Sequence, residues 1–74
     1  MKIIKLTLPQ QPPMFIAMGL DTWRNTATLN VIERFTGLHH SGFTREEVSR
    51  DSLTLEQERS AIVTGTRLFG YIHQ

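Results

Sequence analysis

Two adjacent histidines, His39 and His40, are the residues whose type and spacing first suggest chemistry. Imidazole nitrogens bind transition metals and exchange protons near neutral pH. Adjacent side chains point to opposite sides of an extended segment, and on a helix they diverge by about 100°. Two imidazoles are also fewer than the three or four protein ligands of a zinc site, and His73 would have to join them by chance. We therefore expect an exposed pair on a loop and no metal site.

Carboxylates and hydroxyl groups are the other side chains that could catalyse a reaction. Paired acid–base carboxylates need a cleft that perturbs their pKa values, and 74 residues leave little volume for one. No serine lies in a G-x-S-x-G elbow, no glycine-rich phosphate loop occurs, and the absence of cysteine excludes thiolate nucleophiles. We expect no enzymatic activity and no cofactor. The acids, to which we assign capping and surface roles, are Asp21, Glu33, Glu46, Glu47, Asp51, Glu56 and Glu58.

Residues 31–45 match part of the pattern of a helix-turn-helix, the DNA-binding motif of two helices around a tight turn. Gly37 would be the turn glycine, with apolar residues before and after it. Glu33 stands where a small residue would let the helices touch, and a second register over 44–51 and the residues from 54 would bring acidic side chains to the phosphates. DNA binding is therefore the alternative function. Its predicted contacts are Arg34, Arg45 and Arg50 on phosphates, with His39 and His40 near the groove.

Apolar and aromatic side chains are numerous for so small a core. Met14, Phe15, Met18 and Trp23 lie within ten residues, and segment 62–72 is apolar on more than one side. These residues either fill the core or form a partner interface, where Met, Tyr, Trp and Arg are enriched. Our leading expectation is a non-enzymatic protein that docks on another protein and regulates or inhibits it sterically. Its predicted anchors and flanking contacts are Trp23, Phe69, Tyr71, Arg24 and Arg67. A homodimer through the C-terminal segment would bury the same surplus of apolar side chains.

The N-terminal elements that would position these residues are predicted to be strands. Residues 2–8 alternate between apolar and other side chains with the period of a half-buried strand. The prolines that follow cannot continue a ladder, because proline lacks the N–H group. We expect residues 14–20 to form a hairpin with residues 2–8 across that loop. A helix over 14–20, beginning at Pro13, is the alternative.

Two helices are predicted in the middle of the chain. Residues 26–37 have apolar positions three and four apart, with Asn25 or Thr26 as the N-cap and Gly37 as the stop. Residues 44–51 begin with a capping box, in which the side chains of Thr44 and Glu47 would satisfy each other's backbone N–H groups. Phe43 before the helix and Val48 in its first turns complete the pattern of a hydrophobic staple.

A third helix is predicted over 54–72. Thr54 and Gln57 repeat the capping box in weaker form. Gly65 costs about 1 kcal/mol of helix propensity, so it marks either close packing of another element or a switch to strand within 62–72. The apolar face predicted for this helix comprises Leu55, Ile62, Gly65, Phe69 and Ile72, interrupted by Arg59.

The whole chain has 74 residues, 39% of them hydrophobic, and a formal net charge of +1. We expect one small α+β domain over 1–74, with an all-α bundle that keeps one short N-terminal strand as the alternative. No apolar run approaches the roughly 18 residues that cross a bilayer, and no signal peptide is evident, so a cytoplasmic protein without membrane contact is expected. An accessory protein of a phage or mobile element would fit this description.

Overall fold

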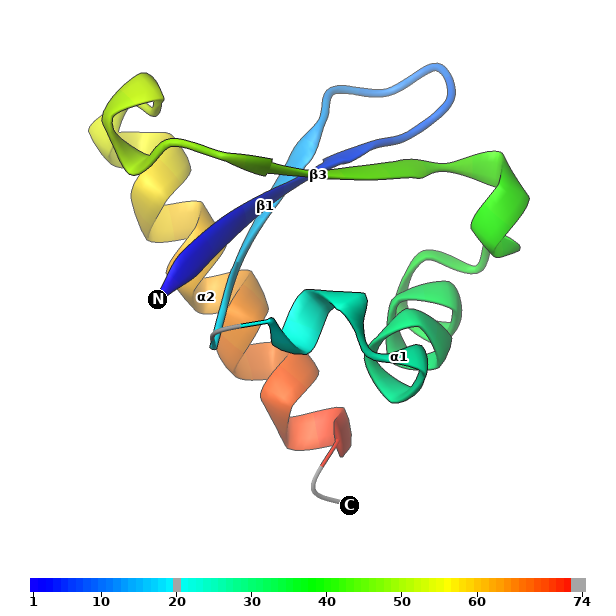
Figure 1. The fold of residues 1–74 in the computed structure, drawn as a ribbon. Coiled ribbons are helices and arrows are strands. Elements are labelled where there is room, and N and C mark those ends of the chain that lie inside the picture. The colour runs from blue at the N-terminus through cyan, green and yellow to red at the C-terminus, as the bar shows by residue number, and fades with distance from the viewer. Residues whose placement is uncertain (20, 73–74) are drawn as a thin grey trace.

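The computed structural model contains a three-stranded antiparallel sheet and two α-helices (Figure 1). It describes residues 1–19 and 21–72, and the side chains of the last helix as far as Leu68. The predicted α+β fold is confirmed, and the all-helical alternative is wrong. The strands are β1 (Lys2–Thr7), β2 (Met14–Met18) and β3 (Thr44–Val48), and the helices are α1 (Thr26–Thr36) and α2 (Leu55–Ile72). Short 3-10 turns cover Thr22–Arg24, His40–Gly42 and Arg50–Ser52.

Strands β1 and β2 form the predicted hairpin across the proline loop. Ile3 lies opposite Ala17 and Ile4 opposite Ile16 in an antiparallel register. Gln10 takes a left-handed conformation, with φ of 58°, where the loop reverses the chain. The alternative helix over 14–20 is wrong; the strand ends at Met18, and the predicted position Leu20 lies outside the described residues.

The hydrophobic core lies between one face of the sheet and the two helices. Alternate residues of β1 and β2 point into it, as the period-2 pattern predicts. Both helices contribute buried side chains to the same cluster. Its buried members are Ile4, Leu6, Leu8, Ile16, Met18, Val31, Ile32, Phe43 and Leu68.

The helix predicted over 44–51 is wrong, because this segment forms strand β3 and the 3-10 turn after it. β3 pairs with the second edge of β1, so that Thr44 lies opposite Thr7 and Val48 opposite Ile3. An eight-residue helix is marginal by itself, whereas the strand satisfies the backbone groups on that edge of β1. Phe43, expected to staple a helix, is instead buried in the core just before the strand. Tertiary pairing therefore overrides a local capping signal.

Helix α1 has the predicted caps at both ends. The Asn25 side chain accepts a hydrogen bond from the backbone N–H of Ala27 at 2.8 Å. Gly37 ends the helix in a left-handed conformation with φ of 73°. This glycine turns the chain back over the last turn of α1, where the loop 38–42 follows.

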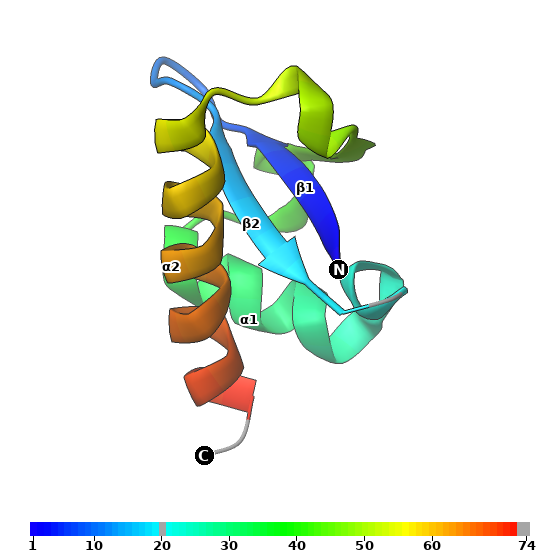
Figure 2. The same cartoon turned by 90° about the vertical axis from the view of Figure 1, so that its left-hand side faces the viewer.

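Helix α2 is continuous through Gly65, so the predicted switch to strand is wrong. The helix predicted over 54–72 is thus confirmed, and the strand switch was its alternative. The weaker capping box is confirmed: Gln57 N–H donates to Thr54 Oγ1 at 3.1 Å, and Thr54 N–H donates to Gln57 Oε1 at 2.9 Å. Close packing at Gly65 is also confirmed, because a Cβ atom there would overlap the carbonyl oxygen of Ala17 and lie 3.0 Å from its carbonyl carbon. α2 therefore lies directly against the backbone of β2 (Figure 2). Of the helices that the structure describes, neither has the length and hydropathy needed to cross a membrane.

Candidate functional site

The side of α2 turned away from β2 carries exposed apolar side chains. Leu55, Ile62 and Val63 are 65%, 42% and 52% exposed, respectively. Their spacing of seven and eight residues places them on one side of the helix. No other element lies along this side in the described part of the chain (Figure 2). We call these three residues, together with Arg59 and Arg67, the outer face of α2.

The predicted apolar stripe of α2 faces the core only in part. Leu55 and Ile62 are exposed, whereas Gly65 of the same stripe lies against β2. Ala61 and Leu68 are the buried side chains in the part of the helix whose side chains are described. The close approach of Gly65 to β2 decides this rotation, because a helix can come so near a strand only where it has no side chain. Leu55, Ile62 and Val63 are consequently left exposed to solvent.

The outer face of α2 is electropositive. Arg59 and Arg67 are exposed, and neither has an ion pair among the side chains that the structure describes. Glu56 is the exposed acid nearest to them along the helix, so the positive charges are only partly balanced. An exposed arginine without a partner keeps its planar set of donors free for a carboxylate.

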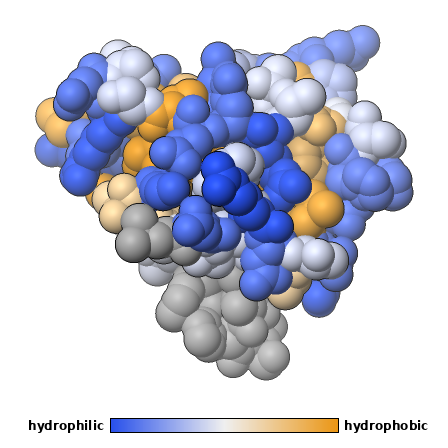
Figure 3. Space-filling model, viewed as in Figure 1, coloured by the Kyte–Doolittle hydropathy of each residue, from blue (hydrophilic) through white to orange (hydrophobic). Residues whose placement is uncertain are grey.

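An open groove of about 400 Å³ runs beside the first turns of α2. Pro12, Pro13 and Phe15 line one side, and Gln57 and Ser60 line the other. The groove extends the accessible surface from the outer face of α2 toward the proline loop. Figure 3 shows the opposite face of the molecule, seen from the side of β1 and β3, where hydrophobic side chains lie in separate patches among hydrophilic ones.

The predicted anchors are not all found on this surface. Trp23 is half-buried against the core, and its indole Nε1 is buried with no hydrogen-bond partner in the described part of the chain. The Arg24 guanidinium lies over the Trp23 ring, 4.8 Å from its centroid. Arg67 belongs to the outer face of α2. Phe69 and Tyr71 lie on the last turns of α2, and their side chains are outside the described part of the structure.

The residues predicted for DNA binding do not form a helix-turn-helix. Strand β3 occupies the segment that would supply one of its helices, in either register. Arg45 donates from Nη1 to the carbonyl oxygen of Trp23 at 2.6 Å, and Arg50 donates from Nε to Glu58 Oε1, also at 2.6 Å. Arg34 is exposed in the last turn of α1. DNA binding itself stays a prediction.

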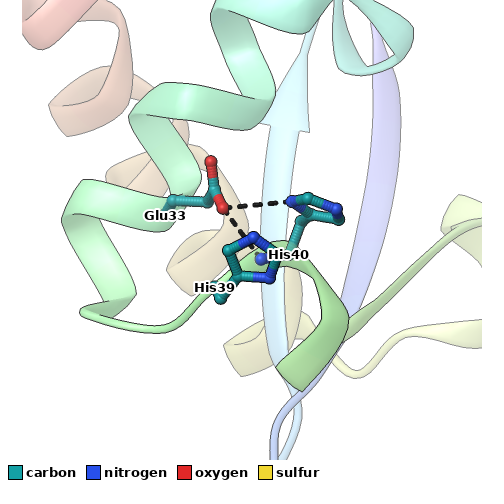
Figure 4. A group of neighbouring side chains, drawn as sticks. All are labelled: Glu33, His39 and His40. Carbon is teal, nitrogen blue, oxygen red and sulfur yellow. Dashed lines mark hydrogen bonds and ion pairs between the residues drawn. The ribbon is translucent and has the colours of Figure 1, made fainter.

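His39 and His40 lie together, contrary to the expectation that adjacent rings diverge. Their ring centroids are 3.9 Å apart, because His39 is extended while His40 begins a 3-10 turn. Glu33, in the last turn of α1, points toward them (Figure 4). His40 Nδ1 is 3.3 Å from Glu33 Oε2, and one ligand atom from each of the three residues lies within 4.8 Å of the others.

The Glu33 carboxylate is held in place by the backbone of the loop. The backbone N–H of His40 donates to Glu33 Oε2 at 2.8 Å. This hydrogen bond, helped by the two histidine side chains, lowers the pKa of Glu33 below its usual 4.5, although partial burial acts against the shift. The carboxylate is therefore ionised at neutral pH and lies beside two imidazole rings.

Two features of these candidate sites were not predicted from the sequence. The apolar pattern assigns Leu55 and Ile62 to a core-facing stripe, although Arg59 on the same stripe is the signal that the stripe faces solvent. Glu33 enters the sequence argument only as a surface acid and as a mismatch to the helix-turn-helix, because nothing in the sequence shows that the loop after Gly37 returns over α1. Comparison with protein-family models, curated proteins and solved structures gave no match for this chain.

Proposed function

We propose that this chain is a non-enzymatic interaction protein that docks on another protein through the outer face of α2 and regulates or inhibits that partner sterically. The observation that carries the proposal is the exposure of Leu55, Ile62 and Val63 on one side of one helix. Exposed apolar side chains are common singly, but three that share a helix face offer a contiguous contact surface. Helix faces with anchors at such spacing dock into apolar grooves on partner proteins.

The partner surface should be apolar at its centre and acidic at its rim. Leu55, Ile62 and Val63 would lose their contact with water, while Arg59 and Arg67 would pair with carboxylates. A second copy of this chain fits less well, because it would bring the same two arginines toward each other. The turn Thr22–Arg24 lies on the opposite side of the fold from the outer face of α2 (Figure 2), so the predicted contacts Trp23 and Arg24 are not part of this docking surface.

The test is a capture experiment from lysate of the source cells, run with and without nuclease treatment and with a tag that contains no histidine. The double variant Leu55→Gln/Ile62→Gln should weaken capture of the partner at least tenfold, since it removes two anchors. Its unfolding free energy should stay within about 0.5 kcal/mol of the parent chain, because both side chains are exposed. Ala27→Gln, at an exposed position of α1, is the matched control and should bind normally.

Charge reversal gives an independent readout of the same face. Arg59→Glu should slow association with an acidic partner and reduce the salt dependence of binding. A partner that binds the Leu55→Gln/Ile62→Gln variant as tightly as the parent chain would contradict the proposal. So would a stable dimer of the purified chain that the same two substitutions dissociate, because a second copy would then cover the face. Recovery of nucleic acid that carries the proteins with it would favour the DNA-binding alternative.

A further inference from the structure

The loop 38–42 and the last turn of α1 bring three side chains with metal-ligating atoms to one place. We propose that Glu33, His39 and His40 form a binding site for a divalent transition metal ion of the zinc class. The sequence alone does not predict this site, because the side chains of two adjacent histidines are expected to diverge. The inference does not depend on the docking surface of α2.

The spacing of the ligand atoms suits a small metal ion. Zinc binds nitrogen and carboxylate oxygen at 2.0–2.2 Å, so the ligand atoms of a tetrahedral site lie roughly 3.3 Å from one another. Glu33 Oε2 and His40 Nδ1 are already 3.3 Å apart. The third ligand atom, on His39, is within 4.8 Å of both, so a small rotation of an exposed side chain would complete a three-residue site. Water would fill the fourth position, as in other open zinc sites.

Two of the three ligands have a second contact that orients them. The Glu33 carboxylate accepts the backbone N–H of His40, and His39 Nδ1 accepts the backbone N–H of Ser41 at 3.3 Å and lies 2.9 Å from the Ser41 hydroxyl. Metal binding through His39 Nε2 would move the ring proton to Nδ1, which would exchange the longer contact with the Ser41 N–H for donation to the Ser41 hydroxyl. Both contacts come from within the loop, so the cluster is assembled before any ion arrives.

Charge and ligand type select the ion. The Glu33 carboxylate and the negative end of α1 both favour a cation at this end of the helix. Imidazole nitrogens prefer Zn²⁺, Cu²⁺ or Ni²⁺ over Mg²⁺, which takes oxygen ligands and keeps its waters. An exposed site with three protein ligands should therefore bind zinc reversibly and leave magnesium in solution.

The experiment titrates the untagged, metal-free chain with zinc chloride in a calorimeter. One zinc ion per chain is expected, and the melting temperature should rise by roughly 5 °C or more at a hundredfold excess over the Kd. His40→Ala and Glu33→Gln should each weaken binding at least tenfold. His73→Ala removes the histidine outside the cluster and should leave the affinity unchanged. Magnesium chloride should give no heat of binding at the same concentrations.

Changes in amide chemical shifts show where zinc binds, for weak and for tight binding alike. Zinc should move the resonances of residues 33 and 38–42 and leave those of α2 in place, and circular dichroism of the variants should show that they are folded. Zinc binding that survives both His40→Ala and Glu33→Gln, or that His73→Ala abolishes, would overturn the proposed site. Binding of several ions with no shift at this loop would show adventitious binding only, which also overturns it.

Discussion

Gly65 is the residue whose side chain, a single hydrogen atom, determines how α2 meets the sheet. Any larger side chain would have to occupy the space of the Ala17 peptide group, since a Cβ atom at this position would overlap the Ala17 carbonyl oxygen. The backbone of β2 cannot swing aside as a flexible side chain could, because it is paired with β1. The loss of helix propensity at this glycine is thus offset by close packing.

Gly65→Ala is expected to destabilise the fold by about 2 kcal/mol. Alanine gains nearly 1 kcal/mol of helix propensity, but overpacking against backbone costs more than that gain. The measurement is urea unfolding followed by far-ultraviolet circular dichroism. Gly42→Ala is the control, since its Cβ would lie 3.9 Å from the nearest atom and should be tolerated. A Gly65→Ala chain more stable than the parent would show that α2 does not approach β2 this closely.

Lys2 links the start of β1 to two acids. Its Nζ lies 3.2 Å from Glu47 Oε1 and 3.3 Å from Asp21 Oδ1, and hydrogen bonds to these carboxylates raise the pKa of Lys2 above its usual 10.5. The charged amine is therefore favoured in the folded chain. Its contribution to stability is complete below pH 10.5 and is lost as the pH rises through the folded-state pKa.

Lys2→Met should consequently show a smaller loss of stability between pH 9 and 12 than the parent chain does. Unfolding by urea at a series of alkaline pH values measures the difference. Lys5→Met is the matched control, because Lys5 has no ion pair in the described part of the chain and its removal should leave the alkaline loss unchanged. The prediction would be contradicted if the unfolding free energies of the parent chain and of Lys2→Met fell equally as the pH rises.

At the scale of elements, the two capping boxes of the sequence have opposite outcomes. The box at Thr54 starts α2, whereas Thr44 lies in strand β3. Thr54→Ala should lower the free energy of unfolding by about 1 kcal/mol, because the N–H of Gln57 loses its acceptor. Thr44→Ala makes the same chemical change within β3; it is the control and should lower the free energy of unfolding by less than half as much. If urea unfolding showed equal losses for the two variants, the Thr54 side chain would have no specific capping role.

The elements that could be predicted from sequence are those whose signals are local. The hairpin follows from period-2 alternation around prolines, and α1 from its spacing, its Asn25 cap and Gly37. β3 could not be predicted, because its pairing with β1 depends on residues far along the chain while its own sequence offers a helix cap. Alternation in β3 is also obscured, since the partners of Ile4 and Leu6 are Glu47 and Arg45.

The sequence predicted which types of residue the docking surface would contain, but not which side of the helix would carry them. Surplus apolar surface and arginine were expected on the C-terminal segment, and Arg67 lies on the outer face of α2 as a contact residue would. Which side of the helix is free depends on the rotation that Gly65 imposes, which the sequence does not specify. The three residues of the proposed metal site meet because Gly37 reverses the chain. Their meeting could not be predicted from the sequence, because tertiary contacts set the path of the loop after the helix.

At the scale of the whole molecule, the sheet has two different edges. β2 lies against α2, while β3 has a strand on one side only among the described residues. The exposed edge of β3 carries Arg45, Glu46 and Glu47 in succession. Charged residues on an edge strand discourage pairing with strands of other molecules. The exposed edge of β3 is therefore unfavourable for the docking of another strand, and the proposed docking surface lies on the helix side of the fold.

The strand order β2-β1-β3 also bears on how the sheet is assembled. The hairpin closes a short loop, but the β1–β3 ladder joins Thr7 to Thr44 and must wait until the intervening chain is in place. Closing the longer loop costs more conformational entropy, and contacts between distant residues slow folding. The packing of α2 on β2 joins residues that are still farther apart, Ala17 and Gly65, so the hairpin is expected to form before either β3 or α2 is added to it.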